Sequence, residues 1–404
     1  MELRVSSKQV FVTRQGIYNR LSEVFAYELI FNDTINVDSD HSSNVRDFIG
    51  NVVEIGLDNL AGRRPAIINL DPELQLDETL LQLSTPQIIL GISPTTPASD
   101  ENIEKLLKLK GHGYKLLLND FVYSQERAEL LKHADIVRIQ VGIGDLREMM
   151  EAITPIREAG VEILADGVDS RDVHARCVQL GFSYFRGNFL CQPNIVEGKR
   201  LASNRTTALR LIASLQAADV SNKEIETLIS QDVTLSYKLL RHINSAFFAL
   251  PREIESIKQA IVYLGLQAIK QWATLISLTN VDDKPSELMN ISMLRGKMCE
   301  LLAEQARLPQ PAGFFTAGLF STLDAIMDAD MGELLEQLPL SQEIKDALLK
   351  REGAIGEAIN CVIAYEQSDW EKSAFQDLDP WKVATTYTEA LSWSDSTLAA
   401  LPSG

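Results

Sequence analysis

Polar side chains follow the ends of several hydrophobic runs in the first half of this 404-residue chain. The clearest case is "YKLLLNDFVYS" (114–124), where a leucine run ends at Asn119 and Asp120. If these runs are parallel strands, their carboxyl ends meet at one edge and the side chains there converge. The side chains at these ends are Glu28, Asn69, Gly91, Asn119, Asp120, Gln140, Asp166 and Arg186. Carboxylate and amide oxygens suit Mg²⁺ or Mn²⁺. Polar residues at strand ends also simply cap and solvate loops, and the spacing alone favours that simpler interpretation.

The elements that would position these side chains are short runs rich in β-forming residues. Eight of them occur, at 9–13, 24–30, 65–70, 87–92, 114–118, 135–141, 161–165 and 182–189. Amphipathic segments such as 98–113 and 146–160 lie between them and each ends at a glycine, which suits a helix C-cap. Alternating strands and helices predict a parallel sheet, and eight strands predict a closed (β/α)8 barrel of the TIM type, with its site at the carboxyl ends of the strands.

The second half of the chain has helical periodicity and few strand signals. Ser221 and Glu224 form the pattern of a capping box, and Asp232 is placed to cap the next helix. A third helix is expected to run without interruption from Ser256 through "LISL" at 275–278. The fold class is therefore α/β followed by all-α. The polar stretch 194–204 predicts the boundary, giving domains of 1–197 and 198–404.

Charge and cysteine usage exclude several classes of protein. The chain has 38 basic and 56 acidic residues, a formal charge of −18 that disfavours nucleic acid as a partner. Its four cysteines lie far apart and have no C-x-x-C spacing, so neither a disulfide framework nor a structural zinc site is predicted. The first ten residues lack an apolar signal region, and no run approaches about 18 apolar residues. We therefore expect no membrane insertion and a cytoplasmic location.

Six motifs along the first half resemble, in order, those of the EAL family. They are "AYELI" (26–30), "AIINL" (66–70), "LLNDF" (117–121), "IVRIQ" (136–140), "LADGVD" (164–169) and "RGNFLCQP" (186–193). The resemblance implies a barrel related to phosphodiesterases that hydrolyse cyclic di-GMP with two divalent metal ions. Fold alone does not imply activity, so each site position has to be compared with the family pattern.

The resemblance implies that this site is degenerate. Glu28 and Asn69 match the signature glutamate and the metal-binding asparagine, and Asp120 matches the second aspartate of the Asp-Asp-Phe-Gly motif. Ile89 stands where a metal-binding glutamate is expected, and Asn119 replaces the first aspartate. Two-metal hydrolysis needs anionic ligands that hold both cations and acidify a bridging water, and these two replacements remove two negative charges.

The remaining motif positions also depart from the family pattern. Arg138 replaces the lysine of the sixth strand, and an arginine is not equivalent to the compact ammonium group of lysine. Asp166 and Asp169 replace longer acidic residues, and Arg186 stands where a glutamine is expected. We therefore expect a vestigial site with no catalytic residue and no metal, formed by Glu28, Asn69, Asn119, Asp120, Arg138, Asp166, Asp169 and Arg186.

The helical half resembles an HDOD domain. The segments that carry this resemblance are "LISQDVTLSYKLLRHINSAFF" (228–248) and "IESIKQAIVYLGLQAIKQW" (254–272). HDOD domains resemble the HD phosphohydrolases but usually lack their metal ligands, and here His242 has no neighbouring aspartate in a His-Asp pair. We expect His242 on or near a helix surface, and a close helix crossing at Gly265.

These observations predict a non-catalytic bacterial signal-transduction protein of EAL–HDOD type. Its resemblance implies a link to cyclic di-GMP pathways that control motility, pili or biofilm formation. The expected partners are other signalling proteins, bound through the HDOD domain, and no cofactor is expected. Two alternatives remain open: an active cyclic di-GMP phosphodiesterase using Mg²⁺ or Mn²⁺, and a sensor that binds cyclic di-GMP without hydrolysis. Homodimerisation also remains open.

Overall fold

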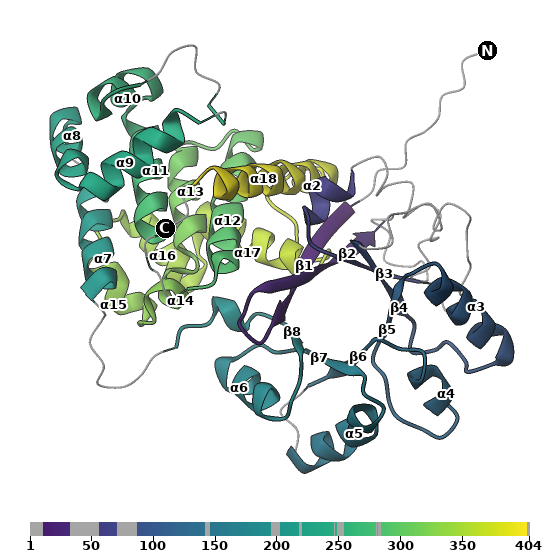
Figure 1. Ribbon diagram of the computed structural model, residues 1–404. Helices are drawn as coiled ribbons and strands as arrows, with labels where there is room; N and C mark the ends of the chain where they lie inside the picture. Colours follow the sequence, from purple (N-terminus) through teal and green to yellow (C-terminus); the bar gives the residue numbers. More distant parts are fainter. Residues whose placement is uncertain are drawn as a thin grey trace, which may run out of the picture. The chain divides into compact units, whose positions relative to one another are not determined.

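The computed structural model describes most of the chain, and its contacts divide the chain into two units, Met1–Leu190 and Cys191–Gly404 (Figure 1). The described residues are 11–32, 56–70, 87–141, 146–194, 203–217, 220–245, 247–248, 254–279, 281 and 284–401. The first ten residues and most of the predicted boundary segment, 194–204, lie outside them. The division at residue 197 therefore remains a prediction.

The first unit contains a closed barrel whose eight strands follow one another in sequence order. They are β1 (Phe11–Asn19), β2 (Val24–Asn32), β3 (Ala66–Asn69), β4 (Ile88–Ile92), β5 (Lys115–Leu118), β6 (Ile136–Gln140), β7 (Glu162–Asp166) and β8 (Tyr184–Arg186). Each of the eight predicted runs contains or overlaps one of these strands, so the predicted barrel is confirmed.

The first strand corrects the prediction of a fully parallel sheet. β1 is antiparallel to both β2 and β8, whereas the other neighbouring strands are parallel. A tight turn joins β1 to β2, with the Ser22 N–H donating to Asn19 O and the Asn19 N–H donating to Glu23 O. A connection this short can only make a hairpin, because a parallel crossover needs about a dozen residues or more.

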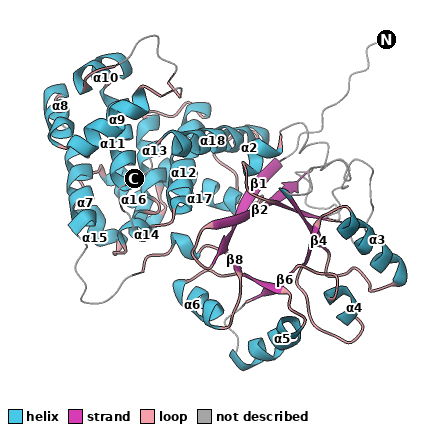
Figure 2. Ribbon diagram, viewed as in Figure 1, coloured by secondary structure: helices cyan, strands magenta, loops and turns pink. Residues whose placement is uncertain are grey.

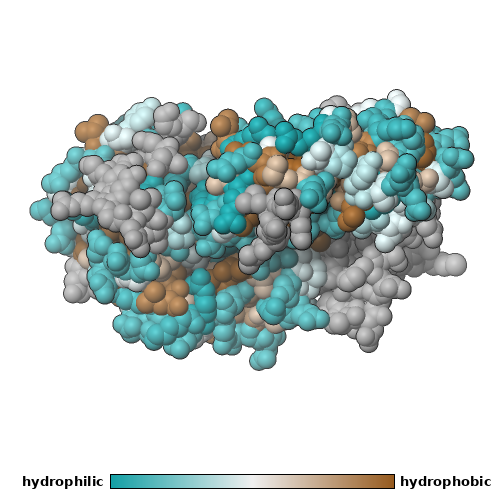
Figure 3. All heavy atoms as spheres, turned by 90° about the horizontal axis from the view of Figure 1, so that it is seen from below, coloured by the Kyte–Doolittle hydropathy of each residue, from teal (hydrophilic) through white to brown (hydrophobic). Residues whose placement is uncertain are grey.

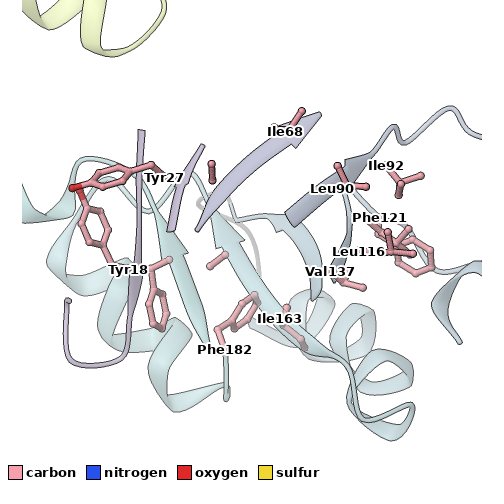
Figure 4. Packing of buried hydrophobic residues seen from close by; sticks show 14 of the residues in the cluster. Tyr18, Tyr27, Ile68, Leu90, Ile92, Leu116, Phe121, Val137, Ile163 and Phe182 are labelled. Atoms are coloured by element: carbon pink, nitrogen blue, oxygen red, sulfur yellow. The ribbon is translucent and has the colours of Figure 1, made fainter. Parts of the chain in front are cut away.

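Helices lie around the outside of the barrel (Figure 2). They are α2 (Leu57–Ala61), α3 (Asp100–Gly111), α4 (Ala128–Leu131), α5 (Leu146–Glu158) and α6 (Arg171–Gln179), and a short 3₁₀ helix, η3 (Phe189–Cys191), follows β8. α3 begins at Ser99, whose side chain accepts a hydrogen bond from the Asn102 N–H. Figure 4 shows part of the hydrophobic layer of this unit, including Tyr27, Leu90 and Phe182. Alternate strand residues thus form an outer apolar layer, and the residues between them face the barrel interior.

A small apolar layer fills the barrel interior. It is a cluster of buried residues with one member from each of the first seven strands: Ile17, Ala26, Ile67, Ile89, Leu117, Ile136 and Leu164. Such a layer makes the inside of an eight-stranded barrel a packed core rather than a channel. It also determines which side of each strand points to the barrel axis, and therefore which residues further along the same strand point there.

The second unit is helical in every element that the structure describes. Its helices are α7 (Ser203–Gln216), α8 (Asn222–Gln231), α9 (Val233–Ile243), α10 (Ile257–Leu264), α11 (Leu266–Thr279), α12 (Ser286–Gln305), α13 (Pro311–Phe320), α14 (Leu323–Met327), α15 (Met331–Glu336), α16 (Gln342–Lys350), α17 (Gly353–Glu366) and α18 (Pro380–Ala400). The capping box at Ser221 and Glu224 is present, and the Asp232 side chain caps α9. Among the described helices, none has the length and apolar content needed to span a membrane.

Gly265 breaks the helix that was expected to run from Ser256 to residue 278. It ends α10 with φ +87°, a conformation that favours glycine, and α11 starts at the next residue. The predicted close crossing at this position is wrong, because a Cβ built on Gly265 would meet no atom within 4 Å. A close approach occurs instead at Gly318 of α13, where a Cβ would lie 2.5 Å from Arg295 O of α12.

Candidate functional site

A polar layer lies directly above the apolar layer inside the barrel. On each strand from β2 to β7 the polar-layer residue comes two positions after the apolar-layer residue, as strand periodicity requires. The members on these strands and on β8 are Glu28, Asn69, Gly91, Asn119, Arg138, Asp166 and Arg186. The fold thus brings together six of the eight predicted vestigial-site residues, together with Gly91, at the carboxyl ends of the strands.

Glu28 is at the centre of the hydrogen bonds in this layer, and its side chain is 2% exposed. Its Oε1 accepts a hydrogen bond of 2.9 Å from Arg138 and another of 2.9 Å from Asn69 Nδ2. Its Oε2 lies 3.1 Å from Arg186 Nε. Both oxygens of the signature carboxylate therefore face groups that belong to the protein itself.

Arg186 connects Glu28 to the other side of the layer. It donates a hydrogen bond of 2.8 Å to Asp166 Oδ2, and its Nε donates one of 2.8 Å to Gln15 Oε1. Gln15 on β1 was not among the predicted site residues. Because β1 runs antiparallel to its neighbours, its residue at this level precedes the apolar-layer residue Ile17 and does not stand at a strand end.

Asn119 and Asn69 form an amide pair beside Glu28. Asn119 Nδ2 donates a 2.8 Å hydrogen bond to Asn69 Oδ1, and Asn69 in turn donates to Glu28. Gly91 lies between the two asparagines, since a Cβ there would lie 2.1 Å from Asn69 Oδ1 and 2.8 Å from Asn119 Nδ2. Glycine is needed at this position because the side chains of β3 and β5 meet across β4.

The electrostatic balance of the layer keeps Glu28 ionised. Burial alone would raise the pKa of Glu28, but the guanidinium groups of Arg138 and Arg186 outweigh it, and the pKa is lowered from its ordinary value. Burial acts to lower the pKa of Arg138, and Glu28 together with Asp166 and Asp120 outweighs it and raises that pKa. Two carboxylates and two guanidiniums therefore compensate each other inside the barrel.

The hydrogen bonding of the layer is less complete than its charge balance. Within the described structure, Arg138 Nε and one of its terminal nitrogens are buried without a hydrogen-bond partner, and so is Asn119 Oδ1. Unsatisfied buried donors are costly, so the groups left without hydrogen bonds offset part of the attraction between the charges of this cluster.

The other predicted residues lie outside the polar layer. Asp120 follows β5 with φ +40° and is exposed, although its charge still acts on Arg138. Asp169 is exposed and accepts a hydrogen bond from the Asn188 N–H. Gln140 lies two positions beyond Arg138, and a Cβ on Gly167 would come 2.6 Å from its Nε2. Ile89 belongs to the apolar layer, and the β4 residue paired with Asn69 is Gly91.

The residues of the polar layer do not fit a pair of divalent cations. A two-metal site needs several anionic ligands that face the metals, whereas here the carboxylates of Glu28 and Asp166 face guanidiniums. At the β4 and β5 positions Gly91 and Asn119 supply no negative charge. In the part of the chain that the structure describes, no group of three or more His, Cys, Asp or Glu side chains could hold a metal ion.

In the helical unit, His242 is buried, which corrects the prediction of a surface position. Its ring packs against Trp272 at 4.1 Å between centroids, and against Phe247 and Phe248. Burial lowers the pKa of His242 to about 4, an effect that the backbone of Ala400 only partly offsets. Among the described residues, no hydrogen bond of ordinary geometry reaches either ring nitrogen. His242 is thus a neutral core residue.

Comparison with known proteins identifies the class of the helical unit and the family of the whole chain. A family model described as "HDOD domain" matches residues 201–354. The chain is 30% identical over 407 residues to "Uncharacterized protein YuxH" of Bacillus subtilis, covering 97% of this chain and 100% of that relative. It is also 30% identical over 371 residues to "Cyclic di-GMP phosphodiesterase CdgJ" of Vibrio cholerae, covering 89% of this chain and 86% of that relative. The chain belongs to the family of EAL–HDOD proteins.

Solved EAL domains are also similar to this chain. The EAL domain of Mycobacterium smegmatis DcpA covers 44% of this chain and 90% of its own, with 18% identity and a TM-score of 0.37. The FimX EAL domain from Pseudomonas aeruginosa bound to c-di-GMP covers 45% of this chain and 89% of its own, with 16% identity and a TM-score of 0.36. The family assignment rests on the two relatives that match along most of the chain.

Proposed function

We propose that this protein is a non-catalytic member of its EAL–HDOD family, which acts through protein contacts in a pathway linked to cyclic di-GMP. In this role the barrel is a regulatory or scaffolding module, and the helical unit binds other signalling proteins. No metal or other cofactor takes part. The processes that we connect with this role are motility, pili or biofilm regulation, in a cytoplasmic protein.

The observation that carries the proposal is the environment of Glu28. Its carboxylate is 2% exposed and faces Arg138, Arg186 and Asn69. A metal ion at this carboxylate would have to displace these groups and leave buried guanidiniums without their counter-charge. Breaking a buried pair in this way costs about 3–5 kcal/mol, which works against metal loading.

A second candidate function is phosphodiesterase activity, which the relative CdgJ favours. Its name describes it as a cyclic di-GMP phosphodiesterase, and it is 30% identical to this chain. The chain also retains Glu28 and Asn69 in contact at 2.9 Å. A sensor that binds cyclic di-GMP without hydrolysis is the intermediate case. Its cationic groups would be Arg138 and Arg186, which must then exchange Glu28 for phosphate oxygens.

Titration of the full chain with cyclic di-GMP separates these functions. Isothermal titration, with and without Mn²⁺ or Mg²⁺, is combined with chromatography of the nucleotide products, and CdgJ serves as the active control. We expect neither heat of binding nor hydrolysis. Binding without hydrolysis would replace the proposal by the sensor. Metal-dependent hydrolysis that disappears in a folded Glu28→Gln variant would replace it by the phosphodiesterase.

A further inference from the structure

Exposed hydrophobic side chains in the helical unit are concentrated on two adjoining helices. Five large hydrophobic side chains are exposed in the described part of this unit, and four of them lie on α9 and α10, which pack against each other. These four are Val233 (79% exposed), Tyr237 (61%), Val262 (82%) and Tyr263 (43%). Single exposed hydrophobic residues are ordinary, as in the scattered brown groups on the face shown in Figure 3, but such a concentration indicates an interaction surface.

The exposed residues are on the faces of these helices that the fold does not use. α9 buries Leu235, Leu239 and Ile243 completely, so its orientation in the unit is well determined. Val233 and Tyr237 lie four residues apart, and Arg241 follows after another four, so all three form one stripe on the outer side of α9. We call Val233, Tyr237 and Arg241 the α9 stripe.

α10 presents a similar outer face. It buries Ile257, Ala260 and Ile261, while Lys258 and Val262 lie one turn apart on the exposed side. Tyr263 is exposed next to Val262. Each helix therefore carries large apolar side chains and a cation on the face that points away from the core.

The charge of this surface is opposite to that of the chain as a whole. α9 and α10 contain three basic residues, Lys238, Arg241 and Lys258, and no Asp or Glu. Arg241 and Lys258 are exposed. The nearest acidic residues in sequence are Asp232, which caps α9, and Glu255, which precedes α10. The chain has a net charge of −18, so the outer faces of these two helices are cationic and apolar on an acidic protein, while α8, which packs against both, carries Glu224 and Glu226.

We propose that the outer faces of α9 and α10 bind an acidic amphipathic helix of a partner protein. Apolar side chains of that helix would cover Val233, Tyr237 and Val262, and its carboxylates would pair with Arg241 and Lys258. A symmetric dimer of this chain through the same faces fits less well, because it would place cations against cations with no carboxylate from either helix. The inference rests on the proposed role of the helical unit in protein contacts.

The test uses the full chain and two labelled synthetic helical peptides with the same leucine face. One peptide carries glutamates on its polar face and the other carries lysines, and fluorescence anisotropy measures binding. We expect the glutamate peptide to bind at least about tenfold more tightly than the lysine peptide, and Val233→Ser with Tyr237→Ser to weaken it by about tenfold. The double change Arg241→Glu and Lys258→Glu should weaken binding and reduce its dependence on salt.

Leu349 provides the matched control. It is 51% exposed on α16, outside the proposed surface, so Leu349→Ser should leave peptide binding unchanged. Equal binding of the two peptides would overturn the proposal. So would a weakening of peptide binding by Leu349→Ser that equals the weakening by Val233→Ser with Tyr237→Ser. So would a dimer, seen by sedimentation, that Tyr237→Ser dissociates, because a second copy would then occupy the surface. Circular dichroism checks that every variant is folded.

Measuring cyclic di-GMP hydrolysis on the same samples separates this inference from the proposed function. Hydrolysis together with selective peptide binding would overturn the non-catalytic function and leave the binding surface standing. Absence of both hydrolysis and selective binding would overturn only the surface.

Discussion

Glu28 in the barrel and His242 in the helical unit are both buried side chains of types that enzymes use. Glu28 is held in its charged form and His242 in its neutral form, and the environments that do so are opposite in kind. Glu28 stays ionised because Arg138 and Arg186 lie next to its carboxylate. His242 stays neutral because its burial among aromatic rings removes it from water, and this burial lowers its pKa to about 4. The identity of a residue therefore does not define its chemistry, which depends on the charged or apolar groups packed against it.

The difference also predicts how each site responds to change. The barrel cluster depends on mutual compensation of charges, so removal of one member leaves another charge buried without its partner. His242 and the aromatic rings around it carry no charge that needs a partner at neutral pH. Burial of His242 therefore lowers the free energy of unfolding only when the pH is low enough to protonate this histidine in the unfolded chain. The stability of the protein should therefore respond most to mutations at the Glu28 cluster, and to a change of pH at His242.

Glu28→Ala should have the largest effect. It leaves the buried Arg138 without its main counter-charge and removes the acceptor of the Asn69 hydrogen bond. We expect the free energy of unfolding to fall by about 3–5 kcal/mol, measured by urea denaturation. A loss below about 1 kcal/mol would mean that Arg138 finds other compensation and that the ion pair is not structural.

The double variant Glu28→Leu with Arg138→Met is the control for this prediction. Removing both charges together leaves no unpaired member of this pair, and apolar replacements of similar volume are often tolerated in such cases. The double variant should therefore be more stable than Glu28→Ala. Strict additivity of the two single changes would argue against direct coupling.

Gly91→Ala tests the close approach of strands β3 and β5. A Cβ 2.1 Å from Asn69 Oδ1 would force the amide pair apart and disturb the hydrogen bond to Glu28. We expect a loss of about 1–3 kcal/mol in the free energy of unfolding. Gly111→Ala is the matched control, because a Cβ at Gly111 of α3 meets no atom within 4 Å.

Asn119→Asp would restore the carboxylate of the family motif, and we expect it to be unfavourable here. Asn119 donates a hydrogen bond to Asn69 Oδ1, and an aspartate at this position would place two acceptors against each other. The expected loss is about 1–2 kcal/mol in the free energy of unfolding. Isothermal titration should show no gain of Mn²⁺ binding, and a tight Mn²⁺ site in this variant would contradict the argument that the guanidiniums exclude metals.

The sequence predicts the barrel well because eight runs of β-forming residues alternate with amphipathic segments, and six motifs follow one another in the family's order. It also found Glu28, Asn69, Asn119, Arg138, Asp166 and Arg186 through their motif positions. It missed Gln15 because the direction of β1 depends on a turn, and no motif covers that strand. The pairing of Glu28 with Arg138 was not predictable either, since 110 residues separate them and only barrel closure brings them together.

In the helical unit, the sequence predicts the type of secondary structure correctly but not how the side chains pack. The pattern around His242 indicated a helix correctly, but it did not reveal that Trp272 and the two phenylalanines cover the ring. Glycine is unfavourable in a helix interior, but this propensity alone does not distinguish a tolerated glycine from the break that Gly265 makes, with its positive φ, between α10 and α11.

Acid should destabilise the protein through His242, and this is the smallest of the expected effects. The pKa of His242 is about 4 in the folded protein, against an ordinary value of 6.5. Below pH 6.5 the unfolded chain binds a proton that the folded protein does not, so the stability contributed by the neutral ring is complete above that pH and is lost as the pH falls. Between about pH 7.5 and about pH 5.5 we expect a loss of about 1 kcal/mol from this residue.

The comparison that isolates this effect is His242→Phe, which keeps an aromatic ring but cannot bind a proton. Burial also lowers the pKa of His174, in the barrel unit, so part of the acid sensitivity should persist in the variant. Urea denaturation at the two pH values should give a smaller loss for His242→Phe than for the unaltered chain. If both lose equal stability, His242 is protonated in the folded protein at these pH values, and the aromatic rings do not hold it neutral in the way that the guanidiniums hold Glu28 ionised.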